Sequence, residues 1–98
     1  MVLEITAITV CPDEGNAFES RFRRASGILA RAPGYLKHEL HKCVETDGKY
    51  LMLVQWQSIS HHSAGFRRSP AYARWREQLD PLLDAEPHTE HYVSIRVR

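Results

Sequence analysis

The sequence predicts an α+β domain of order β-α-β-β-α-β, with two helices covering one face of a four-stranded antiparallel sheet. Four segments alternate apolar and other residues as strands do, and two segments between them carry apolar stripes at helical spacing. The chain has 98 residues, enough for one domain spanning 1–98. No repeat or low-complexity tract divides it. This element order is the split βαβ, or ferredoxin-like, unit.

The composition is that of a folded soluble domain, with 43% hydrophobic and 26% charged residues. A formal net charge of +1 creates no field that attracts polyanions, so we expect neither nucleic acid nor a membrane surface as partner. The first ten residues lack the basic region of a signal peptide, and no apolar run could span a bilayer. We therefore expect a cytoplasmic protein. Cys11 and Cys43 could form one disulfide, but two free thiols are the simpler expectation.

The first half of the chain predicts a strand, a helix and a hairpin. Residues Val2–Val10 are rich in β-branched side chains, and the following Pro12 and Gly15 end the strand. Asn16 and Glu19 have the spacing of a capping box, which predicts a helix start there. The apolar stripe of that helix consists of Phe18, Phe22, Ala25, Leu29 and Ala32, and Pro33-Gly34 ends it. Strands Tyr35–Val44 and Lys49–Gln57 are joined through Thr46-Asp47-Gly48.

The second half predicts two helical segments and a last strand. Ser58 caps a short helix from Ile59 to about Arg67. Ser69-Pro70 has the form of a second helix start, a capping serine followed by proline. The stripe of this helix consists of Tyr72, Trp75, Leu79 and Leu82 or Leu83, and Pro81 kinks or closes it. Residues His88–Val97 are the last strand.

Apolar residues occur on both faces of the two central strands. Lys49–Gln57 places Tyr50, Met52, Val54 and Trp56 on one face, with Leu51 and Leu53 on the other. A sheet covered on one side only would alternate cleanly between apolar and polar residues. A second copy of the chain covers the bare face most economically, so the pattern predicts a homodimer packed sheet against sheet.

The six histidines do not form a metal-binding pattern. His38 and His41, like His88 and His91, lie three apart on predicted strands and therefore point to opposite faces. His61 and His62 are neighbours on a helix, so their side chains diverge by about 100°. We expect no metal site and no bound cofactor, since Gly-rich phosphate loops are absent as well.

His62 is the candidate catalytic residue. It lies one helical turn before Phe66, where its ring faces the sheet either as a satisfied core histidine or as a neutral base. Trp56, Phe66 and Tyr72 are the candidate walls of an apolar slot. Arg67 either holds an anionic substrate group or is a solvated charge at a helix end.

The chain resembles the antibiotic biosynthesis monooxygenase family, as a small single-domain member. The resemblance is carried by PGYLKHEL, YLMLVQW, HHSAGFRRSPAYARW and the closing Pro87–Tyr92 segment, and it covers nearly the whole chain. It implies a ferredoxin-like fold that pairs into a dimeric α/β barrel. Relatives oxygenate aromatic polyketides without metal, flavin or haem, act as quinol monooxygenases, or degrade haem.

The resemblance implies a small-molecule monooxygenase that acts with dioxygen on an aromatic, polyketide or quinol-like substrate without a cofactor. In that reading His62 is the base, and Trp56, Phe66, Tyr72 and Arg67 bind the substrate. One alternative is a non-catalytic dimer that binds a small hydrophobic ligand. The other is a haem-binding or haem-degrading protein. Haem-degrading relatives use an Asn, a Trp and an axial His at positions that correspond here to Thr6, Trp56 and Trp75.

Overall fold

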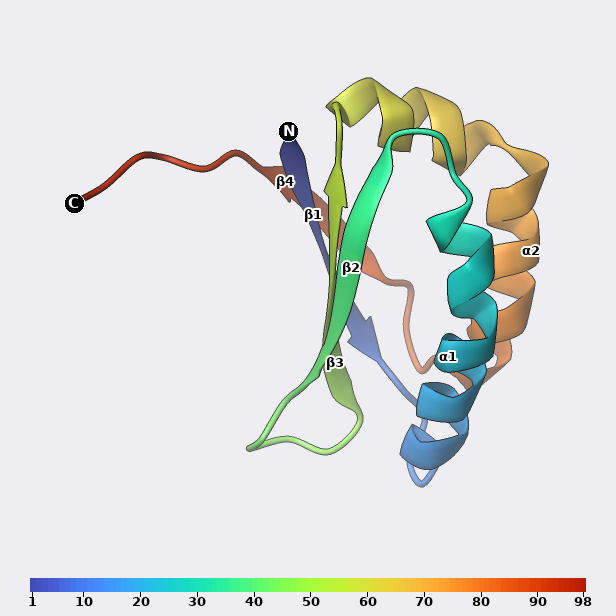
Figure 1. The fold of residues 1–98 in the computed structure, drawn as a ribbon. Helices are drawn as coiled ribbons and strands as arrows, with labels where there is room; N and C mark the ends of the chain where they lie inside the picture. Colours follow the sequence, from blue (N-terminus) through green and yellow to red (C-terminus); the bar gives the residue numbers. More distant parts are fainter.

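The computed structural model describes all residues 1–98 and has the predicted element order (Figure 1). The strands are β1 (Val2–Thr9), β2 (Tyr35–Lys42), β3 (Lys49–Trp56) and β4 (His88–Tyr92), and the main helices are α1 (Gly15–Ala30) and α2 (Pro70–Leu79). The strands form one antiparallel sheet in the order β2-β3-β1-β4. Both helices lie on the same face of this sheet and leave the other face open (Figure 1).

The core lies between the sheet and the two helices. The side chains of Tyr50, Met52, Val54 and Trp56 on β3 all point into it, as their alternation predicts. The predicted stripe of α1 meets them, with Phe18, Phe22, Ala25 and Leu29 all buried. From α2, Trp75 and Leu79 complete the cluster. The predicted alternation of β3 and the predicted apolar stripe of α1 therefore both appear in the structure, and the helices cover the face that carries Tyr50 and Trp56.

The predicted capping box at the start of α1 is wrong. The helix begins at Gly15, its N-cap residue is Glu14, and no side chain caps it, so Asn16 lies inside the first turn. The Glu19 carboxylate instead accepts a hydrogen bond from the Tyr50 hydroxyl, at 2.7 Å. Glu19 is thus committed to a tertiary contact with β3, which local spacing could not reveal.

The segment after β3 is helical, but it is not the predicted α-helix. Ser58 Oγ accepts a hydrogen bond from the His61 backbone N–H, as expected of a cap. A π-helical turn follows at His61–Gly65, and then a 3₁₀ turn at Phe66–Arg68. The wider π turn directs both His62 and Phe66 into the core, where both are buried. Ser69 and Pro70 start α2 as predicted, and Pro81 closes it in a 3₁₀ turn at Asp80–Leu82.

The last strand is shorter than predicted, since β4 ends at Tyr92 and not at Val97. The reason lies in the register with β1, which pairs Tyr92 with Leu3 and so leaves almost no partner strand beyond it. Residues 93–98 have no ladder partner and project away from the helices, on the open side of the sheet (Figure 1). The middle strands likewise end at Lys42 and Trp56, one or two residues before the predicted ends.

The open face of the sheet is apolar at its centre. It carries Leu3 and Ile5 from β1, Leu51 and Leu53 from β3, and Tyr92 from β4. The projecting tail adds the exposed side chains of Val93, Ile95 and Val97. Cys11 and Cys43 are free thiols, as expected. None of the helices has the length and apolar character needed to cross a membrane.

Candidate functional site

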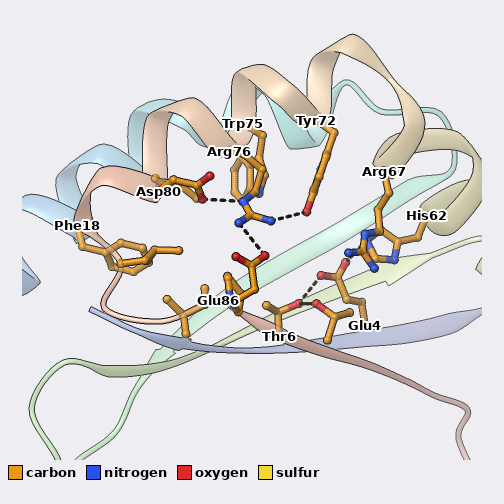
Figure 2. A pocket seen from close by; sticks show the side chains of 15 residues that line it. Glu4, Thr6, Phe18, His62, Arg67, Tyr72, Trp75, Arg76, Asp80 and Glu86 are labelled. Carbon is orange, nitrogen blue, oxygen red and sulfur yellow. Dashed lines mark hydrogen bonds and ion pairs between the residues drawn. The ribbon is translucent and has the colours of Figure 1, made fainter. Parts of the chain in front are cut away.

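A cavity of about 50 Å³ lies between α2 and the sheet, and polar side chains line both its floor and its mouth (Figure 2). The floor is formed by Glu4 and Thr6 of β1, with His62 from the π-helical turn. Phe18, Trp75 and Leu79 supply apolar walls. This volume holds a few water molecules, and a benzene-sized ligand needs about 150 Å³.

Glu4 is a buried carboxyl group that accepts two hydrogen bonds and lies beside His62. Its side chain faces the helices and is 4% exposed. Oε1 accepts from Trp56 Nε1 at 3.0 Å and lies 3.2 Å from His62 Nε2. Oε2 accepts from the Thr6 hydroxyl at 2.5 Å. A carboxylate has about four acceptor positions, so Oε2 keeps one position free toward the cavity.

His62 links Glu4 to His91 through both of its ring nitrogens. Its ring stacks on Trp56, with centroids 5.1 Å apart, and its Nδ1 lies 2.7 Å from His91 Nε2. Burial, together with the nearby charges of His91 and Arg67, lowers the pKa of His62 to about 4. The ring is therefore neutral at pH 7. With Glu4 ionised, the tautomer that suits both contacts presents His62 Nε2–H to Oε1 and accepts His91 Nε2–H at Nδ1.

Burial raises the pKa of Glu4 above its ordinary value, and it outweighs the hydrogen bonds from Thr6 and Trp56, which act in the opposite direction. The positive charges of His91 and Arg67 also oppose the rise. A carboxyl group whose affinity for a proton is raised in this way is suited to general-base chemistry near neutral pH.

The mouth of the cavity carries two arginines, Arg67 and Arg76, and two carboxylates, Asp80 and Glu86. The guanidinium groups of Arg67 and Arg76 each lie 5.8 Å from the centre of the Tyr72 ring. Arg76 donates to the Tyr72 hydroxyl at 2.9 Å, to Asp80 at 2.6 Å and to Glu86 at 3.0 Å (Figure 2). Because Glu86 is 78% exposed, its ion pair with Arg76 contributes little to stability and can open at small cost.

Three of the five predicted site residues, His62, Arg67 and Tyr72, meet around this cavity. The other two, Trp56 and Phe66, are buried in the layer behind His62 and do not line it.

Sequence reasoning missed Glu4 as a site residue, together with its cross-strand neighbour His91. The signal for Glu4 was present, because strand alternation places this acid on the face that also carries Val2, Thr6 and Ile8. A lone carboxyl group among core positions indicates either a mispredicted face or a functional group.

No three His, Cys, Asp or Glu side chains converge in the geometry of a metal site. His61, adjacent to His62, turns away and lies 2.8 Å from Ser58 Oγ through its Nδ1.

Comparisons with known proteins agree on one family. The sequence model of the antibiotic biosynthesis monooxygenases matches residues 1–78. The uncharacterized protein YczJ of Bacillus subtilis (strain 168) is 35% identical over 95 residues, which cover 97% of this chain and 100% of that protein.

Solved structures give the same result. A Bordetella bronchiseptica protein assigned to the antibiotic biosynthesis monooxygenases superposes with a TM-score of 0.94 and 26% identity, covering 97% of each chain. SnoaB, a cofactor-independent oxygenase from Streptomyces nogalater, superposes with a TM-score of 0.83 at 21% identity, covering 98% of this chain and 94% of SnoaB. The chain therefore belongs to the antibiotic biosynthesis monooxygenase family.

Proposed function

We propose that this protein is a small-molecule monooxygenase that needs no cofactor and oxidises an acidic aromatic compound, such as an anthrone or a hydroquinone, with dioxygen. One observation carries the proposal: Glu4 and His62, with Oε1 and Nε2 3.2 Å apart, form the floor of a cavity whose lining also holds Arg67 and Arg76. A base with guanidinium groups nearby can generate and hold a substrate anion. The relative SnoaB is described as a cofactor-independent oxygenase.

The chemistry balances without an external reductant. The Glu4–His62 pair removes a proton from an acidic C–H or phenol, and the resulting anion passes electrons to dioxygen and forms a C–O bond. The peroxide anion takes back the proton. Loss of a second substrate proton then breaks the O–O bond, leaving one oxygen atom as a carbonyl and the other in water. One substrate and one dioxygen thus yield one ketone or quinone and one water molecule.

The cavity lining suggests which substrates fit. Arg67, Arg76 and the Tyr72 hydroxyl offer donors to the oxygen atom that becomes anionic, while Trp75 and Phe18 offer apolar walls. An aromatic ring needs more than the present 50 Å³, so binding must displace the Arg76–Glu86 pair at the mouth. Trp56 supports the slot by stacking on the His62 ring, and Phe66 packs against Trp56.

The assembly that we propose for this enzyme is a homodimer in which the open faces of two sheets meet. Its support is the apolar centre of that face and the unpaired tail 93–98, whose exposed Val93, Ile95 and Val97 alternate with polar residues as in a strand. The partner copy would shield both. Sedimentation at micromolar concentration tests this assembly, and particles of 11.3 kDa alone would contradict it.

The function is tested by oxygen uptake with a panel of anthrones and hydroquinones, together with mass spectrometry of the product after ¹⁸O₂ labelling. We expect one labelled oxygen atom in the product, with turnover unaffected by chelators. The matched control is Ser63→Ala, on the exposed outer side of the π-helical turn, which should retain full turnover. Tight binding of panel compounds without oxygen uptake would instead identify a non-catalytic binding protein.

The site does not fit the haem alternative. Both ring nitrogens of His62 are engaged, one with Glu4 and one with His91, and neither is free to ligate iron. Trp75 lines the cavity where haem-degrading relatives carry an axial histidine, and an indole N–H only donates. We expect no Soret shift on addition of hemin.

A further inference from the structure

Resting on the proposed function, we infer that Glu4 Oε2 is the atom that accepts the substrate proton, and that His62 and His91 are positioning residues that hold Glu4 through a chain of polar contacts. The sequence-based prediction made His62 itself the base. The geometry points instead to the carboxyl group. The reasons are its access to the cavity, the number of polar partners that each group has, and the strand pairing that holds it in place.

Access separates the two candidates. A base needs a free acceptor position within hydrogen-bond reach of the substrate. With His62 Nε2 at 3.2 Å from Glu4 and Nδ1 at 2.7 Å from His91, the imidazole has no free nitrogen. Glu4 lines the cavity, and its Oε2 carries a single hydrogen bond, from Thr6.

The direction of the hydrogen bonds follows from the donor inventory. Thr6 and Trp56 donate to Glu4, and a neutral His62 can present an N–H to Oε1, 3.2 Å away, only when it is protonated on Nε2. The acceptor Nδ1 then requires a donor, which His91 Nε2–H supplies. The tautomer of His91 therefore fixes that of His62, and His62 in turn keeps Oε1 occupied and Oε2 free.

The topology holds the three groups in place. Glu4 and His91 are directly opposite each other on the paired strands β1 and β4, and His62 reaches both from the π-helical turn. The charged and titratable groups around Glu4 are His62, His91 and Arg67, with Arg76, Asp80 and Glu86 also in the cavity lining. Both of the other carboxylates, Asp80 and Glu86, are paired with Arg76.

Two glutamine variants distinguish the two bases. Glu4→Gln keeps the shape and removes the acceptor, so kcat should fall about 10²–10⁴-fold, the usual contribution of a general base, with KM nearly unchanged. His62→Gln keeps a donor for Oε1, and its kcat should stay within about tenfold of wild type, a much smaller loss than for Glu4→Gln. The reverse order of effects would overturn the inference, yet would leave a cofactor-independent oxygenase in place.

His91 provides the test of positioning. His91→Ala removes the donor to His62 Nδ1, which should lower kcat and change the pH profile of kcat on its acid side. His91→Gln carries an amide N–H that can donate in the same way. This variant should therefore retain most of the wild-type kcat and a nearly wild-type pH profile. Equal loss in the two variants would contradict a hydrogen-bonding role for His91.

A readout without turnover keeps the inference testable if no panel compound is oxidised. Side-chain ¹⁵N NMR of the wild-type protein at pH 7 should show neutral His62 with its proton on Nε2, and His91→Ala should reduce that preference. His62 found with its proton on Nδ1, or doubly protonated, would overturn the inference. Absence of oxygen uptake with the expected tautomer would instead refute the proposed function alone.

Discussion

The two faces of strand β1 both depart from the pattern of a sheet with one solvated face. The face toward the helices carries the polar Glu4 and Thr6 between the apolar Val2 and Ile8, all four buried, whereas the face toward solvent carries Leu3, Ile5 and Ala7. A sheet that merely separates a core from water would have apolar residues inside and polar residues outside. The difference indicates that the two faces serve different purposes, because the polar groups inside line a cavity while the apolar groups outside are suited to contact with a second chain.

The polar groups on the covered face also explain why the Glu4 carboxyl group is tolerated in the core. Burying an unpaired carboxyl group costs several kcal/mol, but Glu4 is surrounded by donors from its own strand, from β3 and from the π-helical turn. On the open face no such network exists at the centre, since charged residues there lie on the outer strands, as with Glu39 and His41 on β2. We propose that a second chain buries that face.

The largest effect is expected from placing a charge on the open face. Leu53→Asp puts a carboxylate at the centre of the proposed interface, where desolvation costs several kcal/mol, so the dimer dissociation constant should rise at least about 10²–10³-fold. Sedimentation velocity measures this. Ala73→Asp, on the exposed side of α2, is the matched control and should leave the dimer intact. A Leu53→Asp protein that remains dimeric would show that the open face of the sheet is not the dimer interface.

The buried titratable groups on the covered face, His62 and Glu4, should make the free energy of unfolding depend on pH. His62 titrates near 6.5 when unfolded and at about 4 when folded, so its contribution is complete above pH 6.5 and is lost as the pH falls toward 4. The loss is about 3 kcal/mol at most. The raised pKa of Glu4 acts in the opposite direction, because the folded state takes up that proton first.

Urea unfolding at several pH values between 7 and 4 measures this dependence. His62→Gln should remove most of the acid-side slope, and Glu4→Gln should steepen it. An unchanged slope in His62→Gln would mean that other groups cause the acid sensitivity.

A smaller loss should follow from removing one donor to Glu4. Trp56→Phe preserves an aromatic ring against His62 and deletes the hydrogen bond to Oε1, at a cost of about 2 kcal/mol for a bond to a charged acceptor. Combining it with Glu4→Gln gives a double-mutant cycle, measured by denaturant unfolding. Additive effects of the two substitutions would show that the pair is not coupled.

The smallest effect on stability is expected at the mouth of the cavity. Glu86→Gln weakens an exposed ion pair with Arg76, which should cost under about 1 kcal/mol. Because the same pair restricts the mouth, KM for the larger panel compounds should fall while kcat changes little. An unchanged KM across compounds of increasing size would place the entrance elsewhere.

The fold was predictable from sequence because periodicity reports burial directly. The alternation on Lys49–Gln57 correctly sorted its residues between two faces, and the stripe from Phe18 to Leu29 correctly identified the buried side of its helix. Element ends were less predictable because tertiary pairing sets them. The last strand stops where β1 runs out of partners, and Glu19 bonds to Tyr50 instead of capping its helix.

The site was predictable only in part. Aromatic and histidine residues near the family motif drew attention to His62, Arg67 and Tyr72, which do share a cavity. The contact of His62 with Glu4 joins residues far apart in sequence, and its orientation depends on a π-helical turn that no local pattern indicates. Long-range side-chain hydrogen bonds of this kind are visible only in three dimensions.

A crystal structure of the protein with a bound hydroquinone tests the different roles of the two faces most directly. We expect the ring between α2 and the sheet, one phenol oxygen within about 2.6–3.2 Å of the Glu4 carboxylate, and a second copy of the chain on the open face. A hydroquinone seated on the open face, or a cavity that stays closed with His62 and Glu4 away from the ligand, would contradict the account.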